Sequence, residues 1–434
     1  MQILNWKELS PKEQKTLLDR PAEAMVERHR VAEIMNQVAA EGDRALAKWT
    51  EQFDRVQVSQ WQVGREVRAR ALAEISPPLR QAMANARQNI MSFHTAQKPE
   101  KRIVQTQPGV VCEQWPVPIA RVGLYIPGGS APLFSTVLML AVPAKLAGCG
   151  KVVVATPPNA NGEVHPAILA ACELCGVDEV YAMGGVQAIA ALAAGTESVP
   201  AVDKIFGPGN AWVTEAKRQV TQWFPQVGVD LPAGPSELFV IADGDADADF
   251  VVWDLLSQAE HGADSQVLLV SPSQNLLQAV SQKLAERLDQ LERANTVRGA
   301  LETSRFILCE TLTAAVEISN LYAPEHLILQ VAEPRRLLSQ ITNAGSVFIG
   351  PWSPESAGDY ASGTNHVLPT SGAAKFSGGV SLHSFYKFMT VQELSAEGLR
   401  ALAPTIEAMA WAEGLECHAR ATSIRREKLE AKWG

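Results

Sequence analysis

Short apolar runs that alternate with helical patterns dominate the middle of the chain. The first series comprises the predicted strands 122–126, 152–155, 179–183 and 204–206 and the predicted helices 134–146, 167–175, 188–194 and 211–220. Strands that are apolar throughout, rather than at every second position, are typical of parallel sheets covered on both faces. Because helices separate the successive strands, this series predicts a doubly wound α/β layer.

A second series of the same kind follows. It comprises the predicted strands 237–242, 266–270, 305–309, 326–329 and 346–349 and predicted helices near 250–260, 273–291, 312–322 and 334–342. Its layout resembles that of the first series and suggests an ancestral duplication, although the residues themselves show no repeat. The predicted fold class is therefore α/β, with two doubly wound Rossmann-like parallel-sheet domains.

Helical patterns flank the two predicted sheets. Residues from about 11 to 95 place apolar side chains at helical spacing, and no candidate chemistry is visible in this arm. The segment from residue 391 to the end is also predicted to be helical, with an apolar stripe formed by Leu394, Leu399, Leu402, Ile406 and Met409. The predicted organisation is a helical arm and lead-in (1–118), a first sheet domain (119–236), a second sheet domain (237–380) and a helical tail (381–434).

Composition and charge exclude several classes of protein. The 434 residues carry a net charge of -9, so nucleic acid and anionic membranes are poor partners. The amino terminus lacks an apolar signal core, and the longest apolar stretch, 137–142, is too short to span a membrane. Six scattered cysteines form no disulfide pattern, and Cys172 and Cys175 fall in a helical pattern that favours packing over metal binding. These features predict a soluble, cytoplasmic protein with reduced thiols.

Three glycine-rich segments each end a predicted strand and open a helix. They are Tyr125-Ile126-Pro127-Gly128-Gly129-Ser130, Gly184-Gly185-Val186-Gln187 and Gly207-Pro208-Gly209-Asn210. The usual GxGxxG dinucleotide fingerprint is absent, but free N–H groups and the helix dipole at such helix starts favour phosphate. Each segment alone is more simply a tight turn. Three of them on one carboxyl edge favour a ligand crevice.

Residue types suited to metal binding lie in the second half of the chain. Gln258 and His261 are three residues apart at a predicted helix end, so they could hold a metal from one side. Taken alone, this pair favours an ordinary helix terminus. The polar, glycine-rich loop 356–366 carries Asp359 and His366, and Asp359 could either bind a metal or cap a turn.

The segment Pro324-Glu325-His326 directly precedes an apolar predicted strand. An acid and an imidazole at a strand end are suited to proton transfer, because His accepts a proton near neutral pH and Glu can activate water. The alternative is an exposed strand start without chemistry. On helical spacing alone, Glu413 and His418 in the tail would be surface residues.

Together these segments resemble the histidinol dehydrogenase family. The resemblance extends from the amino-terminal arm to the tail and is carried, in the family's order, by 207–210, 231–237, 256–261, 324–327 and 356–366. A mild departure is Lys375, where the family usually has Arg. The resemblance implies a zinc-dependent enzyme that oxidises L-histidinol through the aldehyde to L-histidine with two molecules of NAD+.

The resemblance also implies roles for individual residues. The expected ligands of one zinc per subunit, which would also contact the substrate, are Gln258, His261, Asp359 and His418. The expected proton-handling pair is Glu325 and His326, the latter also touching the substrate. The expected NAD contacts, in the first sheet domain, are Tyr125, Gln187 and Asn210. Further residues expected to line the substrate site are Ser236, His366 and Glu413.

The chemistry of this ligand set agrees with the implied activity. A neutral amide, two imidazoles and one carboxylate, without a thiolate, leave zinc with residual positive charge suited to an amine and an imidazole. The resemblance further implies a homodimer in which each helical tail completes the active site of its neighbour.

The residues alone leave open two other functions and one other route for the oxidation. A zinc hydrolase could use the same metal ligands with a Glu base, although three glycine-rich turns argue against it. A two-lobed small-molecule binding protein would need no acid and base beside a metal. Within the dehydrogenases, aldehyde oxidation could run through a thiohemiacetal at Cys149, whereas the family resemblance points to hydration of the aldehyde.

Overall fold

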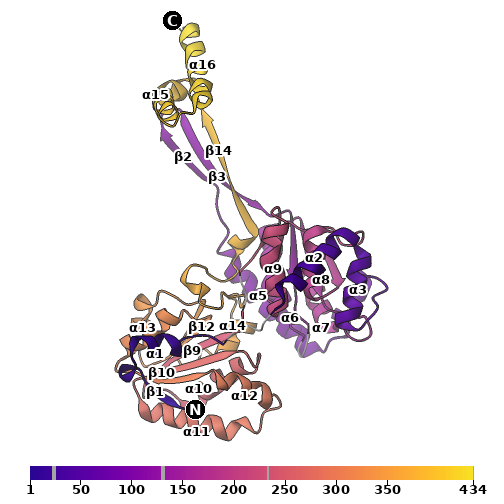
Figure 1. The fold of residues 1–434 in the computed structure, drawn as a ribbon, viewed down its shortest axis with the longest axis vertical. Coiled ribbons are helices and arrows are strands. Elements are labelled where there is room, and N and C mark those ends of the chain that lie inside the picture. Colours follow the sequence, from indigo (N-terminus) through magenta and orange to yellow (C-terminus); the bar gives the residue numbers. More distant parts are fainter. Residues whose placement is uncertain (22–25, 129–131, 232–233, 434) are drawn as a thin grey trace. The chain divides into compact units, whose positions relative to one another are not determined.

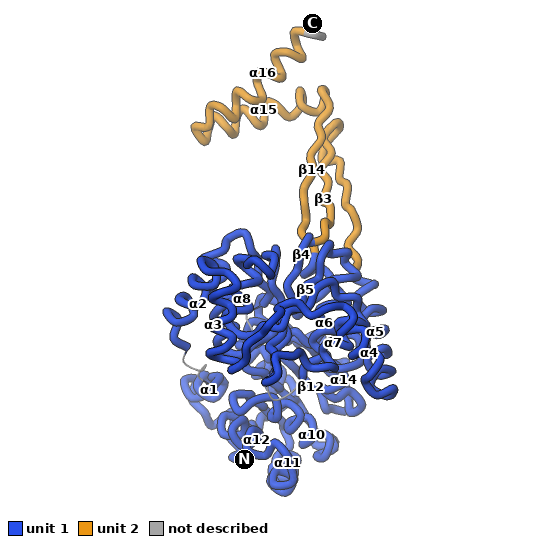
Figure 2. Tube along the Cα trace, turned by 90° about the vertical axis from the view of Figure 1, so that its right-hand side faces the viewer, with its two compact units in different colours: residues 1–97, 119–385 blue, residues 98–118, 386–434 orange. Residues whose placement is uncertain are grey.

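The computed structural model describes residues 1–21, 26–128, 132–231 and 234–433. The chain divides into two compact units, one formed by 1–97 with 119–385 and the other by 98–118 with 386–434 (Figure 2). The predicted glycine-rich segment 125–130 and the motif 231–237 each lie partly outside the described residues.

The first unit contains a sheet of five parallel strands in the order β6-β5-β4-β7-β8. Its strands are β4 (Arg121–Tyr125), β5 (Lys151–Thr156), β6 (Glu179–Ala182), β7 (Lys204–Phe206) and β8 (Gly228–Val229). The helices that connect or follow them are α6 (Phe134–Ala147), α7 (Pro166–Cys175), α8 (Gly185–Ala194) and α9 (Ala211–Trp223). The chain enters this sheet at the central strand β4, adds β5 and β6 on one side, and then crosses to add β7 and β8 on the other side.

A second parallel sheet in the same unit has the order β1-β11-β10-β9-β12-β13. Its strands are β1 (Ile3–Asn5), β9 (Glu237–Ala242), β10 (Gln266–Ser271), β11 (Arg305–Leu308), β12 (His326–Gln330) and β13 (Ser346–Ile349). Apart from β1 at the edge, it repeats the growth pattern of the first sheet, with β9 in the place of β4 and β12 in that of β7. The prediction of two Rossmann-like parallel sheets is therefore confirmed.

Helices cover both faces of the second sheet, which explains why the central residues of its strands are apolar whichever face they point to (Figure 1). The helices are α10 (Ala248–Ala259), α11 (Gln274–Leu288), α12 (Ala294–Glu302), α13 (Leu312–Tyr322) and α1 (Pro11–Leu17). Along β9, Leu238 and Val240 pack with α10, α11 and α12, while Phe239 and Ile241 pack with α13 and α1. All residues of β9 are consequently buried.

The amino-terminal arm is helical, as predicted. Its remaining helices are α2 (Arg28–Glu41), α3 (Asp43–Asp54), α4 (Arg65–Glu74) and α5 (Pro77–Thr95). Val31 and Ile34 of α2 and Trp49 of α3 belong to the same apolar core as the first sheet. The short strand β1 was not predicted, because three residues carry too little periodicity to be recognised.

Several sequence-based predictions were wrong in detail. Residues 334–342 form two short 3₁₀ turns, Pro334–Arg336 and Leu338–Gln340, instead of a helix, since Pro334 limits the preceding backbone. Helix α12 was missed. The expected loop 356–366 begins as a short helix, α14 (Glu355–Tyr360).

The second unit consists of an antiparallel sheet and two helices. The sheet order is β14-β3-β2, formed by β2 (Arg102–Gln107), β3 (Val110–Pro118) and β14 (Tyr386–Leu394), and the helices are α15 (Ala396–Ala412) and α16 (Glu416–Trp433). Residues 391–394, predicted as helical, are therefore part of a strand, because β14 pairs with β3 along its whole length. None of the described helices is long and apolar enough to cross a membrane.

Candidate active site

A cavity of about 720 Å³ lies at the carboxyl edge of the first sheet. Its lining includes residues that follow or end β4, β5, β6 and β7, namely Tyr125, Gly128, Pro157, Gly185, Gln187 and Asn210. All three residues expected to contact NAD therefore line one cavity. This carboxyl edge, beside the strand pair where the growth of the sheet reverses, is where open α/β sheets bind ligands.

Local geometry explains the glycines around this cavity. Gly207 has a φ of 120°, and a Cβ there would lie 2.0 Å from the carbonyl oxygen of Tyr125, so β4 and the end of β7 can approach only without a side chain. The backbone N–H of Gly185 donates to the Tyr125 hydroxyl at 3.1 Å. Asn210 caps α9 by accepting hydrogen bonds from two backbone N–H groups. Two helix starts thus face the cavity.

The amino-terminal arm supplies part of the cavity wall, through Ile34, Phe53 and Asp54. Asp54, the last residue of α3, accepts a hydrogen bond from the side chain of Gln187 at 3.3 Å. Burial raises the pKa of Asp54 to about 6. The sequence analysis identified no candidate chemistry in this arm, and the sequence offers no local signal for Asp54 beyond an acid at a helix end.

Glu325 and His326 lie at the amino edge of the second sheet, next to the start of β9. The backbone N–H of Glu237 donates to Glu325 Oε2 at 2.9 Å, and the backbone carbonyl of Glu237 lies 3.2 Å from His326 Nδ1. Both side chains are buried. A single peptide segment of β9 therefore orients the acid and the imidazole together.

These contacts define the protonation of the pair. A carbonyl oxygen only accepts, so His326 Nδ1 carries the proton and Nε2 keeps a free lone pair. Burial lowers the pKa of His326 to about 3, so the ring is neutral near pH 7. Burial raises the pKa of Glu325 well above its ordinary value, despite the hydrogen bond from Glu237. The arrangement offers a neutral imidazole base and a carboxylate that binds a proton readily.

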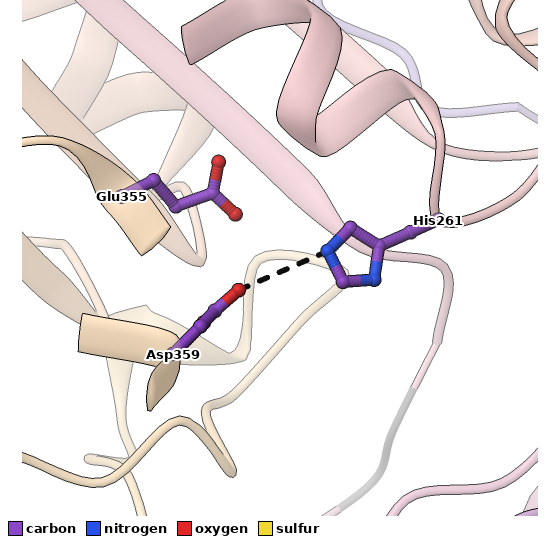
Figure 3. Close-up of side chains that lie close together, drawn as sticks. All are labelled: His261, Glu355 and Asp359. Carbon is purple, nitrogen blue, oxygen red and sulfur yellow. Dashed lines mark ion pairs between the residues drawn. The ribbon is translucent and has the colours of Figure 1, made fainter. Parts of the chain in front are cut away.

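A group of possible metal ligands lies beside His326. His261, Glu355 and Asp359 each place a ligand atom within 4.8 Å of the others, and Figure 3 shows the three side chains converging. His261 Nε2 lies 3.8 Å from Asp359 Oδ2, and His326 Nε2 lies 3.7 Å from Asp359 Oδ1. Glu355 and Asp359 share one face of α14 because they are four residues apart.

Gln258 supports the assignment of this group to a metal. It belongs to the last turn of α10, whereas His261 lies in the turn that follows, rather than on the helix itself. Its side chain is fully buried, and neither polar atom of the carboxamide has a hydrogen-bond partner among the described residues. Because leaving a buried amide unpaired is costly, a further bound group is expected there. An amide, an imidazole and carboxylates are donors that fit zinc.

His366 connects this metal-type group to the first sheet. Its Nδ1 donates to the backbone carbonyl of Asp359 at 2.9 Å, and its Nε2 lies 3.3 Å from the hydroxyl of Thr136 in the first turn of α6. Burial lowers the pKa of His366 to about 4, so the ring is neutral and Nε2 can accept from Thr136. The role of His366 visible here is to hold Asp359 against α6.

The remaining predicted site residues lie in two places. Ser236 is partly buried directly before β9, next to Glu237. Glu413, at the end of α15, and His418, in α16, belong to the second compact unit and are exposed. The structure therefore brings Gln258, His261, Asp359, Glu325 and His326 to one edge of the second sheet.

One member of the metal-type group was missed by the sequence analysis. Glu355 is buried and accepts a hydrogen bond from Ser257 at 3.3 Å, and its other carboxylate oxygen has no hydrogen-bond partner among the described residues but lies 3.9 Å from His326 Nδ1. Its spacing to Asp359 would have indicated a shared helix face, had the segment been recognised as a helix. Cys172 and Cys175 are buried in α7, as their packing interpretation requires.

Comparison with known proteins gives the family. The family model for histidinol dehydrogenase matches residues 19–426. The chain is 55% identical to histidinol dehydrogenase from Vibrio vulnificus over 434 residues, covering 100% of both chains. It is 54% identical over 430 residues to the Escherichia coli K12 protein of that name, covering 99% of this chain and 98% of the other.

A solved structure agrees with these sequence comparisons. The crystal structure of histidinol dehydrogenase from Elizabethkingia anophelis has a TM-score of 0.94 and 45% identity, covering 98% of each chain. Similarity of this extent does not favour the zinc hydrolase. The chain therefore belongs to the histidinol dehydrogenase family and is an oxidoreductase that acts on an alcohol.

Proposed function

We propose that this chain catalyses both NAD-dependent oxidations of L-histidinol, through L-histidinaldehyde to L-histidine, in the cytoplasm. The observation that carries the mechanism is the neutral His326, whose free Nε2 faces Asp359 of the metal-type group. Its buried neighbour Glu325 supplies a second proton acceptor. Two acceptors of different strength suit a reaction with two oxidation steps.

The carboxyl edge of the first sheet and the amino edge of the second sheet would each hold one cofactor. Tyr125, Gln187 and Asn210 would hold NAD+ in the cavity, with the starts of α8 and α9 facing its phosphates. Gln258, His261 and Asp359, together with His418, would hold one zinc per subunit. When bound, NAD+ supplies the hydride acceptor, and zinc supplies a positive charge that orients the amine and imidazole of the substrate.

The chain's own residues would move the protons. In the first step His326 Nε2 takes the hydroxyl proton while the carbinol carbon loses hydride, which leaves the aldehyde. Glu325 then takes a proton from the water that adds to the aldehyde carbon, and the resulting hydrate anion loses a second hydride to give the carboxylic acid, whose proton passes to the solvent to leave the carboxylate. Ser236 and Glu413 would position the substrate.

The test of this function is the amount of NADH formed per L-histidinol consumed. Two NADH per substrate are expected, and a zinc chelator should stop turnover while leaving NAD+ binding, followed by intrinsic fluorescence, intact. A zinc hydrolase or a binding protein would form no NADH. Absence of NADH formation by the metal-loaded protein would refute the proposal.

We also propose that the protein is a homodimer whose active sites are shared. The second unit exposes large apolar side chains, among them Ile103, Val104, Met409 and Trp411, which is costly for a free surface. Such a surface favours a second copy as its partner, so that His418 of the partner subunit completes each zinc site.

Mixed dimers distinguish a shared site from a site within one chain. Take His261→Asn in one chain and His418→Asn in the other, each nearly inactive alone because a lost ligand weakens metal binding. If the sites are shared, one site of the mixed dimer inherits both defects and the other inherits none, so about half of the wild-type activity per dimer should return. A purified mixed dimer that stays as inactive as the single variants would show that His418 acts within its own chain.

A further inference from the structure

Arg20 lies outside the proposed active site but makes several polar contacts with residues next to it, at the start of β9 and in the turn before β12. Its Nε and Nη2 donate to the two carboxylate oxygens of Glu237, at 2.5 and 2.9 Å. Nη2 also donates to the backbone carbonyls of Tyr322 and Ala323, and the guanidinium stacks 4.0 Å from the centre of the Tyr322 ring. Because the planar guanidinium donates to both oxygens of one buried carboxylate, it both pairs with the charge of that carboxylate and fixes its orientation.

The carboxylate that Arg20 holds belongs to the residue that orients the proton-handling pair. The backbone N–H of Glu237 donates to Glu325, and its carbonyl accepts from His326. The side chain of Glu237 is only 3% exposed, and it also accepts a hydrogen bond from the backbone N–H of Ser371 at 2.8 Å. The side-chain contacts of Glu237 therefore fix its position, and its backbone N–H and carbonyl in turn orient Glu325 and His326.

Arg20 also binds the turn that leads into Glu325. Ala323 has a φ of 57° and a ψ of 69°, a left-handed conformation that is uncommon for a residue with a side chain. Backbone strain of this kind persists only where surrounding contacts maintain it. The contacts of Arg20 with the carbonyls of Tyr322 and Ala323 are such contacts, two residues before the catalytic acid.

We propose that Arg20 is a positioning residue for Glu325 and His326, acting through Glu237 and the 322–323 turn. The inference rests on the proposed function, because it concerns the alignment of the two proton acceptors. Arg20 touches neither of them, so its loss should lower the rate of the chemical steps without removing a ligand of the substrate, the metal or NAD+.

The first sheet offers a matched control for the experiment. Arg121 at the start of β4 forms an ion pair with Glu179 at the start of β6, and the two side chains are 18% and 15% exposed. This pair lies at the edge of the first sheet opposite the cavity. Met and Lys substitutions at Arg20 and at Arg121 therefore disturb comparable ion pairs with different neighbours.

The kcat, the KM for L-histidinol, the Kd for NAD+ and the melting temperature should be measured for all four variants. Arg20→Met should lower kcat about thirtyfold, with KM and Kd within about twofold of the wild type. Arg20→Lys, which keeps the charge but loses the fork, should lower kcat about fivefold. The Arg121 variants should show lower melting temperatures but a kcat close to that of the wild type.

The outcomes separate this inference from the proposed function. If the wild type is active and the folded Arg20 variants match the kcat of their Arg121 counterparts, the positioning role is refuted and the proposed function stands. A rise in KM that accounts for the whole loss of kcat/KM would likewise refute it. Should Arg20→Met fail to fold, the same comparison between Arg20→Lys and Arg121→Lys decides the question.

Discussion

The two parallel sheets of the first unit share one strand order apart from the edge strand β1, but their candidate functional residues lie at opposite edges. In the first sheet the cavity lies at the carboxyl edge, where Gly185 and Asn210 begin helices. In the second sheet Glu325, His326 and the residues that close α10 lie at the amino edge. The first site is built largely from backbone at helix starts, and the second from titratable side chains.

The difference follows from the polarity of the connecting helices. Each helix returns the chain from the carboxyl edge of the sheet to the amino edge, so helix starts gather at one edge and helix ends at the other. Starts present N–H groups and a partial positive charge, which suits phosphate, whereas ends carry a partial negative charge, which suits a cation. Gln258 and His261 at the end of α10 are placed accordingly. One fold thus provides one edge suited to an anion and another suited to a cation.

The largest expected effect is a loss of activity on changing the amino edge of the second sheet, with NAD+ binding at the carboxyl edge of the first sheet unchanged. His261→Asn should lower kcat on the order of a thousandfold, because a proposed zinc ligand is lost, while the Kd for NAD+ stays within about twofold. Steady-state kinetics, zinc content and a fluorescence titration with NAD+ would measure this. The exposed His29, in α2, provides the control variant His29→Asn. Equal losses of zinc and of NAD+ affinity would show that the two edges do not act separately.

A smaller effect should distinguish the roles of Glu325 and His326 at the amino edge of the second sheet. Glu325→Gln should retain most oxidation of L-histidinol to the aldehyde but lower aldehyde oxidation about a hundredfold, because only hydration needs the carboxylate. His326→Asn should damage both steps. Single-turnover measurements that start from L-histidinol and from L-histidinaldehyde would test the division. Equal losses in both half-reactions of Glu325→Gln would contradict it.

The sequence predicted the parallel sheets well because burial on both faces leaves a local signal. Strand β9 was predicted at its observed bounds, since all its residues are buried and all but Glu237 are apolar. The antiparallel sheet was missed because β2 is largely exposed and its apolar residues show no clear alternation. Val391 and Leu394 are three residues apart, so the end of β14 was mistaken for a helix.

The candidate site was predictable only where residues carried the family resemblance. On local grounds Gln258 and His261 favoured an ordinary helix end, because the partner Asp359 lies almost a hundred residues further along the chain. Glu355 was not identified as a possible metal ligand because α14 was expected to be a loop. The contribution of Asp54 depends on tertiary packing of the arm, for which a single sequence holds no signal.

A modest effect is expected at the carboxyl edge. Tyr125→Phe leaves the N–H of Gly185 without the hydroxyl acceptor it has in the structure, so the start of α8 should be less well positioned. The loss of one hydrogen bond of about 1 kcal/mol predicts a roughly fivefold higher Kd for NAD+, with kcat unchanged at saturation. Tyr181→Phe, which removes another buried hydroxyl, is the control. An unchanged Kd would show that this contact does not matter for the cofactor.

The smallest effect concerns the one candidate that would bring covalent chemistry to the first sheet. Cys149 follows α6 and is 6% exposed, and its thiol lies 3.9 Å from the carbonyl of Phe385. Burial raises the pKa of this thiol to about 11, so roughly one molecule in ten thousand would carry a thiolate at pH 7. A thiol in this state suits packing better than attack on an aldehyde.

Cys149→Ala should therefore leave kcat within about twofold for both L-histidinol and L-histidinaldehyde, with a melting temperature lowered by the small cavity. Aldehyde oxidation is the sensitive measurement, because a thiohemiacetal would form only in that step. A loss of about a thousandfold in aldehyde oxidation, with L-histidinol oxidation retained, is the result expected for a covalent nucleophile. It would place reaction chemistry in the first sheet and end the division between a backbone edge for the cofactor and a side-chain edge for the protons.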